Sequence, residues 1–142
     1  MRVIEILSPF TDSEPFEVPL YADRCQAGFP SPAQDYVERD LDLNQYCVEH
    51  KSATYYVRAA GESMKDARIQ NGDLLVVDKS LKARHGDIVI ASVAGEFTVK
   101  MLLLQPRIAL QPMNSDFPTL YMDPDDLEIW GVVTFNIQNL RG

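Results

Sequence analysis

Short runs of β-forming residues recur from residue 54 to the end of the chain, with turn residues between them. The runs cover residues 54–59, 74–77, 88–93, 96–102, 107–111 and 127–137. Glycine and aspartate precede several of them at intervals of roughly a dozen positions, a spacing typical of antiparallel strands. Ala94-Gly95 separates two runs by only two residues, which predicts a β-hairpin. We therefore expect a mostly β fold: an antiparallel β domain with short helices.

The first 32 residues differ from the rest because they carry five of the nine prolines. Proline fixes φ and cannot donate a ladder hydrogen bond, so this region is expected to be an extended N-terminal arm rather than a packed subdomain. Residues 17–21 could add one edge strand to it. Residues 40–49 predict a short helix with an acidic first turn. A length of 142 residues suits one domain with such an arm.

Charge and cysteine content exclude several classes of function. Thirteen basic against 21 acidic residues give a net charge of −8, which argues against a surface that binds nucleic-acid phosphates. No apolar run approaches the roughly 20 residues that a bilayer-spanning helix needs, and Glu5 interrupts the N-terminal apolar stretch, unlike in a secretory signal. Cys25 and Cys47 suggest neither a disulfide framework nor a zinc site. We expect a cytoplasmic protein with no metal or other cofactor and no membrane contact.

Ser63 is the first candidate for chemistry, because it follows Gly61 in a segment that reads as a tight turn. Residues 64–68 can begin a helical turn, so backbone N–H groups at its start could stabilise an oxyanion. A serine hydroxyl is a weak nucleophile unless an adjacent base takes its proton. The alternative is that Ser63 only caps the helical turn.

Lys100 is the candidate base, since a buried lysine loses part of its affinity for the proton. Strand alternation places Lys100 on the same face as Thr98 and Leu102. Its side chain is then either exposed on a polar face or directed into a partly dry cleft, as Leu102 and Leu104 suggest. A Cys–His nucleophile built from Cys47 with one of the two histidines is the weaker alternative.

Ala27-Gly28 lies between polar residues and the turn-forming segment Phe29-Pro30-Ser31-Pro32. A peptide bond between two small residues in an exposed turn is accessible to attack. The sequence thus offers a bond for cutting as well as a candidate nucleophile and base.

These features together resemble the LexA-like self-cleaving serine–lysine peptidases, and within them the UmuD branch associated with SOS mutagenesis. The matching stretches are Ala27-Gly28-Phe29-Pro30-Ser31-Pro32-Ala33, Asp42-Leu43-Asn44-Gln45, Ser52-Ala53-Thr54-Tyr55-Tyr56-Val57, Gly61-Glu62-Ser63-Met64, Asn71-Gly72-Asp73-Leu74-Leu75-Val76-Val77-Asp78, His85-Gly86-Asp87-Ile88-Val89-Ile90-Ala91, Gly95-Glu96-Phe97-Thr98-Val99-Lys100 and Pro112-Met113-Asn114-Ser115. The UmuD branch has Cys where this chain has Ala27; Ala-Gly is typical of the repressors. Only 27 residues precede Gly28, too few for a repressor's DNA-binding domain.

The resemblance implies that Ser63 is the nucleophile, Lys100 its general base and Ala27-Gly28 the chain's own scissile bond. It implies backbone N–H groups of Ser63 and Met64 as the oxyanion site, and a division into an arm, residues 1–27, and a peptidase domain, residues 28–142. It further implies a homodimer, cleavage stimulated by a RecA–single-stranded-DNA filament, and a trimmed product that joins a UmuC-type translesion polymerase. Two alternatives remain: a non-catalytic polymerase-binding module, and a peptidase that acts on other proteins as signal peptidases do.

Overall fold

The computed structural model describes residues 1–8, 14–21 and 37–142, and for residues 37 and 38 the backbone alone. The chain forms two compact units. The first contains Met1–Pro9 and His50–Gly142, and the second contains Phe10–Glu49.

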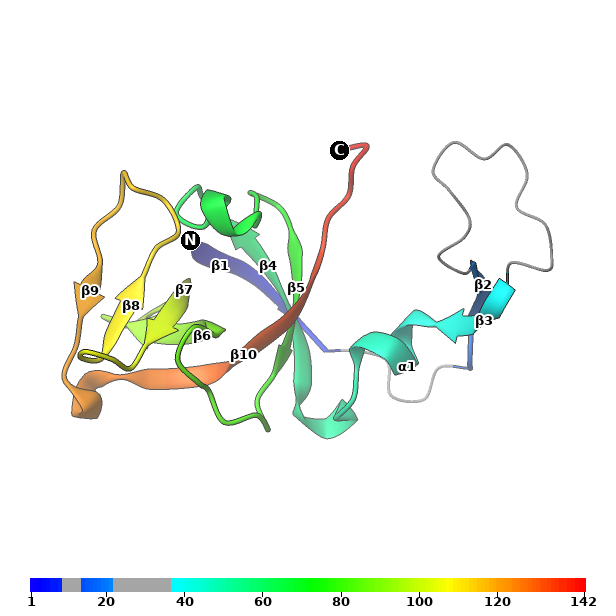
Figure 1. Cartoon of the computed structure of the whole chain (residues 1–142), viewed down its shortest axis with the longest axis horizontal. Helices are drawn as coiled ribbons and strands as arrows, with labels where there is room; N and C mark the ends of the chain where they lie inside the picture. Colours follow the sequence, from blue (N-terminus) through cyan, green and yellow to red (C-terminus); the bar gives the residue numbers. More distant parts are fainter. Residues whose placement is uncertain (9–13, 22–36) are drawn as a thin grey trace. The chain divides into compact units, whose positions relative to one another are not determined.

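The first unit is a single antiparallel sheet of eight strands (Figure 1), which confirms the predicted mostly β fold. The strands are β1 (Arg2–Leu7), β4 (Thr54–Ala60), β5 (Leu74–Asp78), β6 (Ile88–Val93), β7 (Glu96–Leu103), β8 (Ala109–Gln111), β9 (Leu120–Tyr121) and β10 (Glu128–Ile137). Their order in the sheet is β1-β4-β5-β10-β6-β7-β8-β9, and β1 also pairs with β7. This last pairing closes β1, β4, β5, β10, β6 and β7 into a ring.

The predicted hairpin is present between β6 and β7. Val93 pairs with Glu96, and the two residues between them, Ala94 and Gly95, both have positive φ, at 51° and 81°. Positive φ at both central residues is the mark of the two-residue turn whose twist matches that of the flanking strands. The register set by this turn places Lys100 opposite Val89.

Two hydrophobic clusters form the core of this unit, and β6 and β7 contribute to both. The first cluster includes Val57, Val77, Ile90 and Val99. The second consists of Val89, Ala91, Leu102, Leu110 and Val132. Because neighbouring residues of a strand point to opposite faces, β6 and β7 are buried on both sides. This is why residues 88–91 read as a continuous apolar run.

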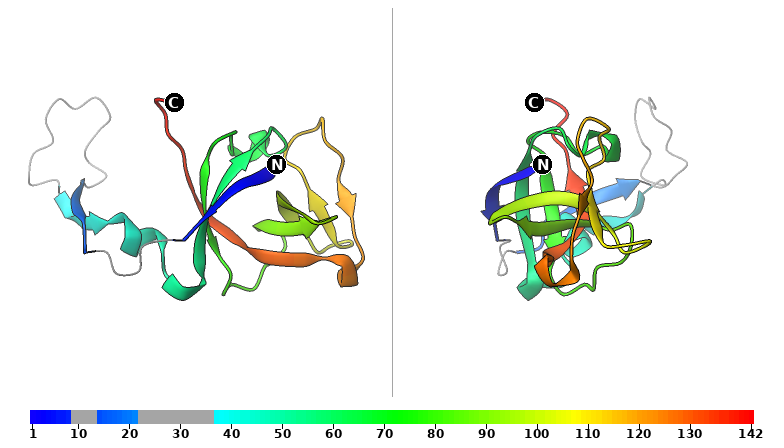
Figure 2. Two further views of the ribbon diagram at one scale, coloured as in Figure 1. Left: turned by 180° about the vertical axis from the view of Figure 1, so that it is seen from behind. Right: turned by 90° about the vertical axis from the view of Figure 1, so that its left-hand side faces the viewer.

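Strand β1 was not predicted from the sequence, which assigned residues 1–7 to the proline-rich arm. The strand instead pairs with β4 from Arg2 opposite Ala60 to Leu7 opposite Tyr56. The two further views in Figure 2 show it lying against the sheet. The prolines of the arm begin only at Pro9, so nothing in residues 1–8 prevents a hydrogen-bonded ladder.

The second unit contains a hairpin-like pair of strands and a short helix. Strand β2 (Glu17–Tyr21) is the predicted strand, and it pairs with β3 (Val37–Asp42). The predicted helix over 40–49 is present only as α1 (Leu43–Cys47), because its first residues belong to β3. The Asp42 side chain caps α1 by accepting the N–H of Asn44 at 2.9 Å, as asparaginyl and aspartyl N-caps commonly do.

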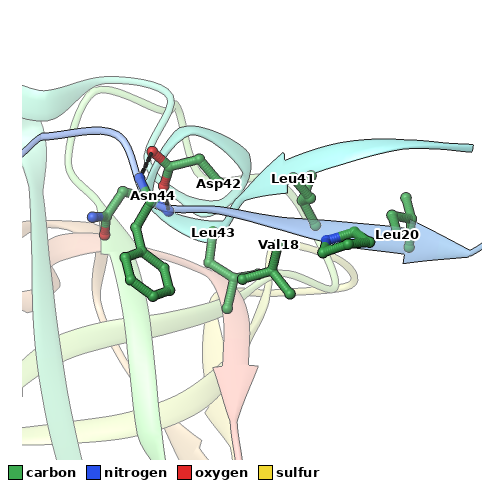
Figure 3. Close-up of a pocket in the computed structure, with 8 residues that line it drawn as sticks. Val18, Leu20, Leu41, Asp42, Leu43 and Asn44 are labelled. Atoms are coloured by element: carbon green, nitrogen blue, oxygen red, sulfur yellow. Dashed lines mark hydrogen bonds between the residues drawn. The ribbon is translucent and has the colours of Figure 1, made fainter. Parts of the chain in front are cut away.

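A pocket of about 380 Å³ lies on this second unit (Figure 3). It is mostly apolar and is lined by Phe16, Val18, Pro19, Leu20, Leu41, Asp42, Leu43 and Asn44. Asp42 also accepts the backbone N–H of Phe16 at 3.1 Å, so a single carboxylate holds both β2 and α1 at the edge of the pocket.

Candidate active site

Ser63 lies in a turn between β4 and β5 that several contacts hold in place. Gly61 has φ of 108°, a conformation that side chains disfavour, and its N–H donates to Asn71 Oδ1 at 3.0 Å. Asn114 donates through Nδ2 to the carbonyl of Glu62 at 2.7 Å. Met64 is fully buried in the first cluster. The turn therefore presents Ser63 from a backbone that is anchored on both sides.

The capping alternative for Ser63 is not supported by this geometry. The helical turn that follows is a short 3₁₀ helix, Lys65–Ala67, and the residue at its N-cap position is Met64. Among the residues that the structure describes, no side chain makes a capping hydrogen bond there. The Ser63 hydroxyl instead accepts a hydrogen bond from Lys100 Nζ at 3.2 Å.

Lys100 is buried, with 7% of its surface exposed, so the alternative of a solvated lysine on a polar strand face does not hold. It follows Val99 of the first cluster and shares its strand face with Leu102 of the second. Its ammonium nitrogen also donates to Thr98 Oγ1 at 2.8 Å and to the Val99 carbonyl at 3.2 Å. Strand alternation pointed to Thr98 as a neighbour of Lys100 but assigned it no contact.

Burial lowers the pKa of Lys100 below its ordinary value of 10.5, although its interaction with the Met1 amino group partly opposes the shift. Removing an ammonium from water disfavours its charged form. A larger share of Lys100 is therefore neutral at a given pH than for a lysine on the surface. A neutral amine within hydrogen-bond distance of a hydroxyl is able to accept its proton.

The first residue of the chain reaches the same place. The Met1 amino group donates to Ser63 Oγ, and Met1 itself is 6% exposed. Burial is the main reason that the pKa of this amino group falls from 8.0 to about 5, and the neighbouring Lys100 lowers it further. No pattern in the sequence indicates this contact, which joins residues 62 positions apart.

Two backbone N–H groups, those of Ser63 and Met64, lie at the candidate nucleophile. Within the part of the chain that the structure describes, neither the N–H of Ser63 nor that of Met64 is paired with a protein acceptor. Neighbouring N–H groups in such a turn are suited to an oxygen that carries developing negative charge.

The other sequence candidates that the structure describes are His50, His85 and Cys47. Ala27, Gly28 and Cys25 lie outside the described residues. The Nδ1 atom of His85 accepts the N–H of Leu104 at 2.9 Å, and Nδ1 of His50 lies 2.6 Å from Asp78 Oδ2. Burial raises the pKa of the Cys47 thiol, which opposes thiolate formation. No pairing of Cys47 with a histidine is seen among the described residues.

No helix in residues 1–8, 14–21 or 37–142 has the length and apolar character needed to cross a bilayer. In those ranges, no group of three or more histidine, cysteine, aspartate or glutamate residues is arranged to hold a metal ion.

Comparison with known proteins identifies the family to which this chain is similar. The family described as Peptidase S24-like matches residues 19–134. Protein MucA of Salmonella typhimurium is 54% identical over 136 residues, which cover 94% of this chain and 93% of that protein. Protein ImpA of Salmonella typhimurium is 60% identical over 125 residues, with 87% and 85% covered.

A LexA repressor from Verminephrobacter eiseniae is more distant, at 36% identity over 129 residues. The match covers 89% of this chain but 57% of the repressor, so the repressor has a large part that this chain does not match. These findings confirm the resemblance to the LexA-like peptidases and their UmuD branch, and the chain belongs to the S24-like peptidase family.

Proposed function

We propose that this protein is a self-cleaving serine peptidase of the SOS response that cuts its own Ala27–Gly28 bond. The observation that carries the proposal is the 3.2 Å hydrogen bond between Lys100 Nζ and Ser63 Oγ inside a buried site. A lysine with a lowered pKa beside a serine hydroxyl is the arrangement that serine–lysine catalysis requires. Membership of the S24-like peptidase family supports the same reaction class.

In the proposed reaction, neutral Lys100 takes the proton of the Ser63 hydroxyl while Oγ attacks the carbonyl carbon of Ala27. The N–H groups of Ser63 and Met64 stabilise the oxyanion. The bond between the Ala27 carbon and the Gly28 nitrogen then breaks, and Lys100 returns its proton to that nitrogen. Water, deprotonated by Lys100, hydrolyses the ester on Ser63. The products are residues 1–27 with a new carboxylate and residues 28–142 with a new amino group.

The partners are proposed from the resemblance. On this view a RecA–single-stranded-DNA filament in the cytoplasm stimulates cleavage, and the trimmed homodimer serves as an accessory subunit of a UmuC-type translesion polymerase. The net charge of −8 is compatible with work through protein partners rather than direct DNA binding. Relatives named MucA and ImpA support an SOS mutagenesis setting.

The test is incubation of the purified full chain from about pH 8 to about pH 10, approaching the ordinary lysine pKa, followed by intact-mass measurement. We expect two products that sum to the chain plus one water, with the larger beginning at Gly28. Ser63→Ala and Lys100→Ala should each abolish cleavage. Ser92→Ala, opposite Phe97 in the ladder, and Lys82→Ala, in an exposed loop, serve as matched controls and should cleave normally.

Activated RecA filament should accelerate the same cut near neutral pH. If no fragment beginning at Gly28 forms under either condition, the protein is instead a non-catalytic binding module. Cleavage that persists in Ser63→Ala would rule out the assigned nucleophile. A mixture of intact protein and the Ser63→Ala variant shows whether one molecule cuts another, since only cleavage between chains can trim the variant.

A further inference from the structure

Strand β1 fills the space between β4 and β7 beside the candidate dyad, and this space is called the groove. It pairs along its length with β4 and meets β7 where Arg2 lies opposite Thr98. At this end the Met1 carbonyl accepts the N–H of Val99 and the hydroxyl of Thr98, both at 2.9 Å. The strand is therefore tied to the residues immediately before Lys100 as well as to β4.

The start of β1 covers both groups that the proposed reaction uses. The Met1 amino group donates to Ser63 Oγ, so it stands where a reacting carbonyl would have to approach. Ser63 is 3% exposed and Lys100 is 7% exposed in this arrangement. A scissile carbonyl must come within about 3–3.5 Å of the attacking oxygen, and Met1 already fills that space.

We propose that β1 acts as an internal plug, and that it must leave the groove before the scissile bond can reach Ser63. This inference rests on the proposed function and adds a means of regulating cleavage. In the structure β1 is docked, so the site is closed. Docked β1 and a docked scissile segment are mutually exclusive. A factor that binds the open state more tightly would raise the cleavage rate by shifting this equilibrium.

The contacts of β1 indicate that displacing the strand costs little free energy. Ile4, Ile6 and Leu7 are 55%, 54% and 39% exposed, so these apolar side chains add little to docking. Of the strand and the residue before it, only Met1 is buried, and Val3 is partly buried against the first cluster. The apolar contribution to docking therefore comes mainly from one methionine side chain. The plug is held chiefly by its backbone ladder, which a competing extended segment can replace.

Disulfide locks test the proposal directly. Arg2 and Ala60 are register partners in β1 and β4, and neither side chain is buried. The variant R2C/A60C, in a background with Cys25→Ser and Cys47→Ser, should form a cross-link that keeps β1 in the groove. A second lock, E5C/R58C, joins the same strands farther along, where Glu5 and Arg58 form an exposed ion pair at 3.0 Å. The control V93C/E96C cross-links β6 to β7 and leaves β1 free.

Cleavage is followed by intact mass under alkaline conditions and with activated RecA, before and after reduction. We expect the oxidised R2C/A60C protein to lose cleavage and to regain it when reduced. The E5C/R58C protein should also cleave more slowly when oxidised than when reduced. The oxidised control should cleave at the rate of its reduced form. Equal cleavage by the oxidised and reduced forms of R2C/A60C would overturn the plug. Failure of the serine background itself to cleave would count against the proposed function instead.

Discussion

Lys100 Nζ lies 3.2 Å from Ser63 Oγ although the two residues are 37 positions apart in the chain. The hairpin of β6 and β7 brings the lysine to this point, and the turn anchored by Gly61 and Asn114 brings the serine. Because the contact is buried, the charge on Lys100 determines what the pair can do. At low pH the lysine is a hydrogen-bond donor only, and after losing its proton it is a base.

The rate of self-cleavage is therefore expected to rise with pH and to level off below the ordinary lysine pKa of 10.5. Burial lowers the pKa of Lys100, so the neutral form accumulates earlier than it would in water. Lys100→Arg should show no rise, because a guanidinium keeps its proton across the accessible range. Single-turnover rates measured by intact mass at a series of pH values would check this. A pH-independent rate in the unaltered protein would contradict the assignment of Lys100 as base.

The burial that lowers the pKa of Lys100 should also make the folded state less stable at low pH. When a buried amine has a lowered pKa, the unfolded chain binds more protons, and the free energy of unfolding rises with pH between the two pKa values. For Lys100 that window ends at 10.5, and for the Met1 amino group it runs from about 5 to 8.0. Stability from both groups is thus lost as pH falls through these windows.

Lys100→Met should accordingly abolish cleavage yet raise the free energy of unfolding at neutral pH by about 1 kcal/mol, as replacements of strained functional groups often do. Urea unfolding of the variant and the unaltered protein at several pH values measures the difference. That difference should shrink as pH approaches 10.5. Lys82→Met, which removes an exposed ammonium, is the control and should change stability little. Destabilisation by Lys100→Met would show that its hydrogen bonds outweigh its burial.

Asn114 is expected to act as a positioning residue for Ser63. It is 5% exposed, donates to the Glu62 carbonyl at 2.7 Å and accepts the N–H of Asp116 at 3.0 Å. Asn114→Ala leaves that carbonyl without its partner and should cost about 1–2 kcal/mol of stability. It should also slow cleavage about tenfold or more, since small displacements of a nucleophile are costly.

The pH dependence of cleavage distinguishes a displaced Ser63 from an altered pKa of Lys100. The contacts of Lys100 are untouched by Asn114→Ala, so the midpoint of the pH–rate curve should stay in place while the plateau falls. Asn136→Ala removes an exposed asparagine that donates to Asp73 at 2.9 Å and should leave the plateau unchanged. An Asn114→Ala protein that is less stable but cleaves at the normal plateau would exclude this role.

The sequence predicted the strands that have their own local signals. The two-residue turn at Ala94-Gly95 set the register of β6 and β7, and the alternation of β7 allowed a buried Lys100. The sequence alone did not decide between a buried and an exposed Lys100, because the burial of Lys100 depends on β7 being covered on both faces. Such cover comes from residues as distant as Val57 and Leu110. Strand β1 was missed for a similar reason: its pairing partners are in β4 and β7, 49 or more positions away.

Gly131 should be intolerant of a side chain. It lies at a register shift in β10, with φ of 154°, and a Cβ built there would come within 2.5 Å of Val77 Cγ1 and 3.3 Å of the Asp78 carbonyl oxygen. Gly131→Ala should therefore lower the free energy of unfolding by about 2 kcal/mol, as overpacking does. Gly72→Ala is the matched control, because its φ is 91° but nothing lies within 4 Å. It should cost about 1 kcal/mol from backbone strain alone.

Urea unfolding of both glycine variants provides the comparison. The informative quantity is the excess loss in Gly131→Ala over Gly72→Ala, since both share an unfavourable φ for alanine. Equal losses in the two variants would show that strand β10 moves away from Val77 at little cost.

Cutting the chain at Ala27–Gly28 should leave the two products bound to each other. The bond lies between β2, which ends at Tyr21, and β3, which begins at Val37. The smaller product would carry β1, paired with β4 and β7, and β2, paired with β3 across five register positions from Glu17 to Tyr21. We expect β1 to return to its groove after the cut. Size-exclusion chromatography of the cleaved protein should then show co-elution of both fragments, and denaturant should separate them. Immediate separation without denaturant would mean that these pairings depend on the intact chain.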